Sequence, residues 1–244
     1  MALSLGARVD LITRLTADYD RAVLDGINLI AIGAEQCCRY ANSYDGNGDR
    51  TQLLLAEGDP INPSFIAQDG ADAYFLAPAY HEFAAMPPLH ASVLAVSLQG
   101  PLRSTSEGGR VIHHPHPLAQ AGPFLAPGTL AFLSEEDTAD APGLCRYIAS
   151  RGAVALLTRG YQGAVMFEGA NELPFDAIPA HSIDSTGAGD CFAMAFVVRM
   201  VETRDLAEAC RFALAAGSLA VEGVGAAAVP ARQAVEERLG KVAV

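Results

Sequence analysis

The spacing of hydrophobic residues along the chain predicts an α/β protein. Short apolar runs bounded by polar or glycine-containing segments are typical of buried strands, and longer apolar segments favour helices. Alternation of the two implies a mostly parallel sheet with helices on both faces. Strands are expected at Val9–Leu15, Leu29–Ile32, Ala73–Leu76, Val93–Ser97, Leu130–Leu133, Val154–Thr158, Ala164–Glu168 and Glu172–Ile178, and helices at Ala17–Gly26, Gly189–Glu202, Leu206–Glu222 and Ala231–Leu239.

A hairpin interrupts this pattern early in the chain. Cys38–Tyr44 and Thr51–Ala56 alternate in part between apolar and polar residues, and the segment between them, Asp45–Asp49, contains two glycines. This arrangement predicts two antiparallel strands joined by a tight turn. We therefore expect a β lid at residues 38–56, inserted into an α/β domain made of residues 1–37 and 57–244. Residues 104–126, rich in Gly, Pro, Ser and His, are expected to be the least ordered segment.

Composition limits the possible partners. The chain has 244 residues, of which 51% are hydrophobic, so one large core is available. Its net charge is −12, and Lys241 is its single lysine. This balance argues against nucleic acid and anionic membranes as partners, although backbone N–H groups and a metal ion can still hold a nucleotide.

Other features favour a cytoplasmic protein. No apolar stretch has the length of a membrane span, and no early stretch has the basic start and apolar core of a signal peptide. Five scattered cysteines without a C-x-x-C pattern suit reduced thiols. The histidines of His113–His116 lack a cysteine or acid at metal-ligand spacing, which favours a solvated loop over a metal site.

The segment Asp-Ser-Thr-Gly-Ala-Gly-Asp-Cys-Phe, residues 184–192, carries the clearest chemistry. A polar turn runs into the apolar segment Cys191–Val201, as at the start of a buried helix. The first turn of a helix has N–H groups without intrahelical partners, and Gly187 and Gly189 let an anion approach them. Asp190 would then accept a proton from a hydroxyl that attacks a phosphoryl group. On these residues alone, an ordinary glycine turn with an acid favoured by the helix dipole remains the alternative.

Several ordered motifs together resemble the ribokinase-like, or PfkB, family of carbohydrate kinases. Asp184–Asp190 resembles the second signature of that family. Ser134-Glu-Glu-Asp137 resembles its N-x-x-E element, with Ser for Asn and Asp for Glu. Leu156-Leu-Thr-Arg-Gly160 followed by Gly163 resembles its T-x-G…G segment, Gln99-Gly100 with Arg103 resembles a Q-G-x-x-R element, and Phe212–Gly225 resembles the helix and loop that cover the adenine.

The resemblance implies a three-layer α/β/α sandwich with a mostly parallel central sheet and a small β lid. It also implies transfer of the γ-phosphoryl group of ATP to a hydroxyl of a sugar or polyol, with inositol-like and nucleoside acceptors included. Asp190 would be the general base, and the backbone N–H groups of Gly187, Ala188, Gly189 and Asp190 would form an anion hole.

The remaining site residues follow from the same resemblance. Mg²⁺ would be held through water by Glu136 and Asp137, and a potassium ion by Asp184 and Thr186. Gln99 and Arg103 would contact the acceptor. The nucleotide would be bound by Ser134, Thr158, Gly160, Gly163, Leu214 and Gly217. Relatives often pair through the lid, so a homodimer is expected.

One departure from the family leaves a second interpretation open. Family members begin with a strand and a Gly-Gly signature that help to form the sugar pocket, whereas Leu5–Thr13 matches the stretch after that signature. About 35–50 residues of the usual start are therefore expected to be absent. A non-catalytic nucleotide-binding or assembly protein of the same fold is the alternative to a kinase. A dinucleotide oxidoreductase and a P-loop enzyme are disfavoured, because the chain has no early G-x-G-x-x-G and no G-K-[ST].

Overall fold

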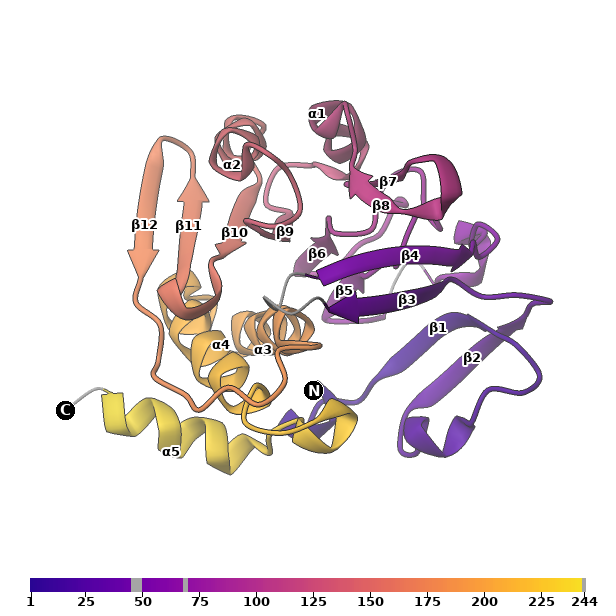
Figure 1. The fold of residues 1–244 in the computed structure, drawn as a ribbon. Coiled ribbons are helices and arrows are strands. Elements are labelled where there is room, and N and C mark those ends of the chain that lie inside the picture. The colour runs from indigo at the N-terminus through magenta and orange to yellow at the C-terminus, as the bar shows by residue number, and fades with distance from the viewer. Residues whose placement is uncertain (45–49, 68–69, 243–244) are drawn as a thin grey trace.

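The computed structural model describes residues 1–44, 50–67 and 70–242 and contains a central six-stranded sheet. Neighbouring β5, β6, β9 and β10 are parallel, whereas β11 and β12 run antiparallel at one edge. The sheet and its helices confirm the predicted α/β fold class (Figure 1). In sheet order the strands are β12 (Asn171–Phe175), β11 (Ala164–Glu168), β10 (Val154–Thr158), β9 (Leu130–Ser134), β6 (Val93–Ser97) and β5 (Ala73–Leu76).

Helices cover both faces of this sheet. Because side chains alternate along a strand, Phe132 and Leu156 pack on one face, and Leu133 and Leu157 on the other. The first face is covered by α3 (Ala188–Thr203) and α4 (Leu206–Ala220), with α5 (Arg232–Val242) packed against α4. The second is covered by α2 (Ala141–Ser150), near α1 (Pro117–Ala121) (Figure 1).

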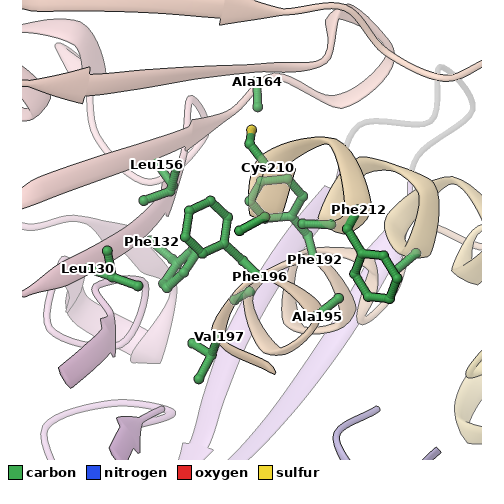
Figure 2. Packing of buried hydrophobic residues seen from close by; sticks show 14 of the residues in the cluster. Leu130, Phe132, Leu156, Ala164, Phe192, Ala195, Phe196, Val197, Cys210 and Phe212 are labelled. Atoms are coloured by element: carbon green, nitrogen blue, oxygen red, sulfur yellow. The ribbon is translucent and has the colours of Figure 1, made fainter. Parts of the chain in front are cut away.

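An aromatic cluster fixes α3 against the middle of the sheet. The ring of Phe132 on β9 meets Phe196 edge-on at 5.5 Å between centroids and Phe192 at 6.3 Å (Figure 2). All three side chains are at least 96% buried, and edge-to-face geometry is the favourable arrangement for aromatic rings. This packing determines where the first turn of α3 lies relative to the strand ends.

A separate pair of strands lies near the amino terminus. β1 (Asp10–Leu15) and β2 (Asn28–Gly33) pair in parallel and match the strands predicted at 9–15 and 29–32. The helix predicted at 17–26 is wrong, because only a 3₁₀ turn at Arg21–Leu24 forms there. None of its residues is buried, so the segment has no apolar face to pack and is too short to be stable as an isolated helix.

The predicted hairpin is confirmed in its strands. β3 (Arg39–Tyr44) and β4 (Arg50–Ala56) pair antiparallel, while the predicted turn at 45–49 lies outside the described residues. The expectation of low order at 104–126 is wrong. β7 (Arg103–Thr105) pairs with β8 (Val111–His113), and an antiparallel bridge from Leu53 to Arg110 joins this ribbon to the hairpin. Backbone hydrogen bonds between strands thus hold this segment in place, whereas buried apolar side chains hold the strands of the central sheet.

Over the described parts of the chain, the helices are too short or too polar to cross a lipid bilayer.

Candidate functional site

Three parallel strands end at the same edge of the sheet and bring separate motifs together. Ser134 at the end of β9 lies directly opposite Thr158 at the end of β10, and Ser97 of β6 lies opposite Phe132. Gln99 therefore begins a turn beside Ser134. The carboxyl ends of parallel strands form the usual ligand-binding edge of an α/β sheet.

Asp137 is held at this edge by its neighbours. Its Oδ2 accepts a hydrogen bond from the Ser134 N–H at 2.7 Å, and its carboxyl also bonds the Gln99 side chain. The N–H of Glu136 donates to Ser134 Oγ at 3.2 Å. Burial raises the pKa of Asp137, and the Ser134, Gln99 and Arg103 contacts partly oppose that rise. The Gln99 and Ser134–Asp137 motifs, about 35 residues apart in the sequence, thus form one cluster.

The first turn of α3 is opened by Gly187. Its φ of 81° and ψ of 0° place it in the left-handed region, which favours glycine, and α3 begins at the next residue. The Ala188 N–H donates to the Ser185 carbonyl at 3.2 Å, so one of the four predicted anion-hole donors has a partner within the loop. Gly189 has open space around the position of a side chain.

Asp190 lies in this first turn of α3. Its side chain is exposed to solvent, yet enough protein surrounds the carboxyl for the loss of hydration to raise its pKa. The positive charge of Arg103 opposes this rise. A carboxyl that is accessible and has a raised pKa is suited to accept a proton from a bound hydroxyl.

Arg103 lies between the cluster and the hairpin. Burial raises the pKa of both Asp137 and Asp190, and the guanidinium charge of Arg103 opposes this rise at both carboxyls. Its Nη1 donates to the Ala79 carbonyl at 2.9 Å, and its Cζ lies 4.7 Å from the centre of the Tyr40 ring on β3. Tyr40 and Ala79 are the residues at this site that sequence reasoning missed.

The two parts of the predicted potassium site also meet. The Asp184 carboxylate accepts hydrogen bonds from the N–H groups of Thr186 and Gly225, which lower its pKa. The N–H groups of Ile183 and Asp184 in turn donate to the Val221 carbonyl at 2.7 and 3.2 Å. The loop before α3 is thereby tied to the loop after α4.

The remaining predicted nucleotide residues are spread over the neighbouring elements. Thr158 Oγ1 donates to the Leu133 carbonyl at 3.4 Å, and Gly160 starts the turn after β10. Gly163 has φ of +89°, and a Cβ there would lie 2.1 Å from the Phe175 carbonyl oxygen. Gly217 of α4 faces the first turn of α3, and half-buried Leu214 packs against the core beside it.

The histidines gather near the same site without forming a metal centre. The rings of His81, His114 and His116 are spaced by 6.3 and 6.2 Å between centroids. Among the residues that the structure describes, no three histidine, cysteine or acidic side chains are placed to hold a metal ion. His81 Nε2 instead bonds the Arg103 backbone carbonyl at 3.0 Å, so this histidine helps to hold the backbone at Arg103 in place.

Comparisons with known proteins identify similar carbohydrate kinases. Residues 129–233 match the family model for pfkB family carbohydrate kinase. Ribokinase of Bacillus subtilis (strain 168) is 28% identical over 98% of this chain and 84% of its own length. Ribokinase of Arabidopsis thaliana is 42% identical over a shorter stretch, covering 33% of this chain and 22% of its own length.

Solved structures show the same fold. A sulfate complex of a pyrophosphate-dependent kinase in the ribokinase family has a TM-score of 0.74 at 20% identity, over 96% of this chain and 87% of its own. Ribokinase from Thermotoga maritima has a TM-score of 0.69 at 17% identity, over 95% and 81%. The family match over residues 129–233, the ribokinase relatives and the shared fold together confirm the resemblance of this chain to the ribokinase-like (PfkB) carbohydrate kinases, which are phosphotransferases that act on an alcohol group.

Proposed function

We propose that the protein is an ATP-dependent kinase that transfers the γ-phosphoryl group to a hydroxyl of a sugar or polyol. The observation that carries this proposal is the placement of Asp190. Its side chain is exposed at the first turn of α3, and the charge of Arg103 acts on its carboxyl as it does on that of Asp137.

In this reaction Asp190 accepts the proton, and backbone N–H groups of α3 bind the phosphoryl group. The acceptor hydroxyl gives its proton to the Asp190 carboxylate, and its oxygen forms the new bond to the γ-phosphorus. The bond from that phosphorus to the bridging oxygen breaks, and its electron pair leaves with ADP. Backbone N–H groups at the start of α3 hold the moving phosphoryl group, where the helix dipole also favours negative charge.

The cluster at the end of β9 fits a magnesium ion bound through water. Ser134 N–H and Gln99 already bond the Asp137 carboxyl, so its oxygens suit contacts with the waters of a hydrated ion. Glu136 and Asp137 would hold that hydrated ion. When bound, Mg²⁺ neutralises the charge on the phosphate oxygens.

The Asp184 loop fits a potassium ion, because its carboxylate and the loop at 223–227 are in direct contact. Asp184 and Thr186 would hold the ion there, and the ion would add positive charge beside the anion hole. We expect activity to rise when potassium replaces sodium, and this response to weaken in Asp184→Asn. An equal rate in both salts would contradict the potassium site and would leave the proposed kinase function unaffected.

An activity assay with several donors and acceptors would identify the substrates. Solved relatives include a pyrophosphate-dependent kinase complexed with myo-inositol and an Arabidopsis thaliana ribokinase complexed with ribose and ATP. The assay therefore offers ATP or pyrophosphate with sugars, inositols and nucleosides, and measures phosphorylated product. ATP with a polyol acceptor is the expected pair.

Asp190→Asn tests the proposed base. The change keeps the shape and removes the proton acceptor, so kcat is expected to fall by about 10²–10⁴. Asp25→Asn, at an exposed residue after the 3₁₀ turn near the amino terminus, is the control and should retain activity. Wild-type protein that is folded, binds ATP and phosphorylates no acceptor would instead favour a nucleotide-binding role.

The hairpin is also the proposed contact between two subunits. Leu55 is 58% exposed, and Leu53 and Ile112 on the joined ribbons are 37% and 43% exposed. Burying such apolar side chains together would stabilise a dimer. Sedimentation should show a dimer for the wild type and a monomer for Leu55→Glu. A wild-type monomer at all concentrations would refute this contact.

A further inference from the structure

A phosphoryl-transfer site needs positive charge, and in this chain arginine supplies nearly all of it. Its net charge is −12, and its single lysine, Lys241, lies in α5. Arg103 is the arginine whose charge acts on both Asp137 and Asp190. A cation whose charge acts on both carboxyls of the proposed site is suited to bind the phosphates of a donor there.

The guanidinium of Arg103 is held from the side of the hairpin. The Ala79 carbonyl accepts two hydrogen bonds, from Arg103 Nη1 at 2.9 Å and from Tyr40 Oη at 2.7 Å. The Tyr40 ring also lies against the guanidinium, at 4.7 Å from Cζ to the ring centre. Such a cation–π contact and a shared acceptor fix both the plane and the direction of the guanidinium. The three residues come from β3, the loop after β5 and the start of β7.

A glycine makes this shared acceptor possible. A Cβ on Gly100 would lie 2.2 Å from the Pro78 carbonyl oxygen and 2.7 Å from that of Tyr80. The absence of a side chain lets the segment that carries Ala79 pass directly over the turn that carries Arg103. The Arg103 carbonyl is itself bonded by His81 Nε2 at 3.0 Å, so the two segments are joined on either side of the arginine.

From this geometry we propose that Arg103 is the cation that binds the transferred phosphoryl group, and that Tyr40 of the hairpin is its positioning residue. The inference rests on the proposed kinase function and deepens it. An arginine has five N–H donors in a planar fork that matches phosphate oxygens, and the bond to Ala79 uses one of them. The hairpin therefore acts on the reaction through the guanidinium.

Steady-state kinetics separate this role from acceptor recognition. Arg103→Gln should lower kcat by about 10²–10³ while the KM for the acceptor stays within about twofold, because the lost charge acts in the transition state. Arg103→Lys should recover part of the rate. A rise in the acceptor KM with kcat unchanged would overturn the proposal and assign Arg103 to the acceptor.

Variants of Tyr40 test the positioning role. Tyr40→Leu removes the ring and the hydroxyl, and kcat should fall about ten- to hundredfold through misplacement of the guanidinium. Tyr40→Phe keeps the ring and loses one neutral hydrogen bond, so it should stay within about fivefold of wild type. The control is Gln52→Ala, which removes a bond to Asn42 within the same hairpin and should leave kcat unchanged. Equal losses in Tyr40→Leu and Gln52→Ala would overturn the positioning role.

A binding measurement judges the inference even if no acceptor is phosphorylated. Titration calorimetry with inorganic pyrophosphate should show binding by the wild type and at least tenfold weaker binding by Arg103→Gln, a loss of the size expected for a charge-assisted contact. Tyr40→Leu should weaken binding less. A wild type that transfers no phosphoryl group would refute the kinase function, whereas wild-type and Arg103→Gln proteins that bind pyrophosphate equally, or not at all, would refute the cation assignment.

Discussion

At the scale of single residues, Asp190 makes the activity depend on pH in a definite direction. Burial raises its carboxyl pKa above the usual 3.8, and Arg103 is the charged group that opposes the rise. A general base works only when ionised, so the rate should fall as the pH falls through this raised pKa. Arg103→Gln removes the opposing charge and should move this fall to higher pH. A pH–rate profile that is unchanged in this variant would contradict the coupling.

Gly163 provides a residue-scale test of stability. Alanine there would need a φ near +89° and would place Cβ 2.1 Å from the Phe175 carbonyl oxygen. Backbone strain and overpacking together should lower the free energy of unfolding by about 2–4 kcal/mol. Gly160→Ala is the matched control, because its φ is also positive but nothing lies within 4 Å, and it should cost about 1 kcal/mol. Urea denaturation that gives equal losses would show that the close contact relaxes freely.

At the scale of elements, the position of α3 depends on its aromatic contacts with β9. Phe196 is fully buried against Phe132, so Phe196→Ala should cost about 3–5 kcal/mol in the free energy of unfolding. Phe65→Ala, at a side chain that is 48% exposed, should change it by less than about 0.5 kcal/mol. Thermal and urea unfolding of the two variants measure this contrast.

Elements with a strong pattern were predictable from the sequence, and those that depend on distant partners were not. The strands at 73–76, 93–97 and 154–158 coincide with their predicted ranges, since a buried parallel strand is a short apolar run. The order of the ribbon at β7 and β8 comes from pairing of the two strands with each other and from one bridge between Arg110 and Leu53 of β4, which a local pattern does not reveal.

The candidate site shows the same division. The Gly187–Asp190 motif was found because a glycine turn before an apolar segment is visible locally, and Ser134–Asp137 was found through its resemblance to a family element. The contacts of Tyr40 with Arg103 and Ala79 span about 40–60 residues and depend on how the hairpin lies over the sheet. Only the folded chain reveals such contacts.

At the scale of the whole molecule, donor binding should be separable from turnover. A ligand that binds only the folded state stabilises it by about 2.7 kcal/mol at a hundredfold excess over Kd. ATP should therefore raise the melting temperature of wild type and Asp190→Asn alike, because the substitution keeps the shape of the side chain. A melting temperature that millimolar ATP leaves unchanged in both proteins would contradict ATP as the donor and would also exclude the nucleotide-binding alternative.

The close packing of α4 on α3 has a further consequence. At Gly217 a side-chain carbon would sit 3.7 Å from both the Ala188 carbonyl oxygen and Phe192 Cβ, so the two helices touch almost backbone to backbone at the turn where Asp190 lies. Because α4 packs against it, the first turn of α3 loses little conformational entropy when it binds an anion. The entropy of ordering the anion hole is therefore lost once, during folding, and is not lost again in each catalytic cycle.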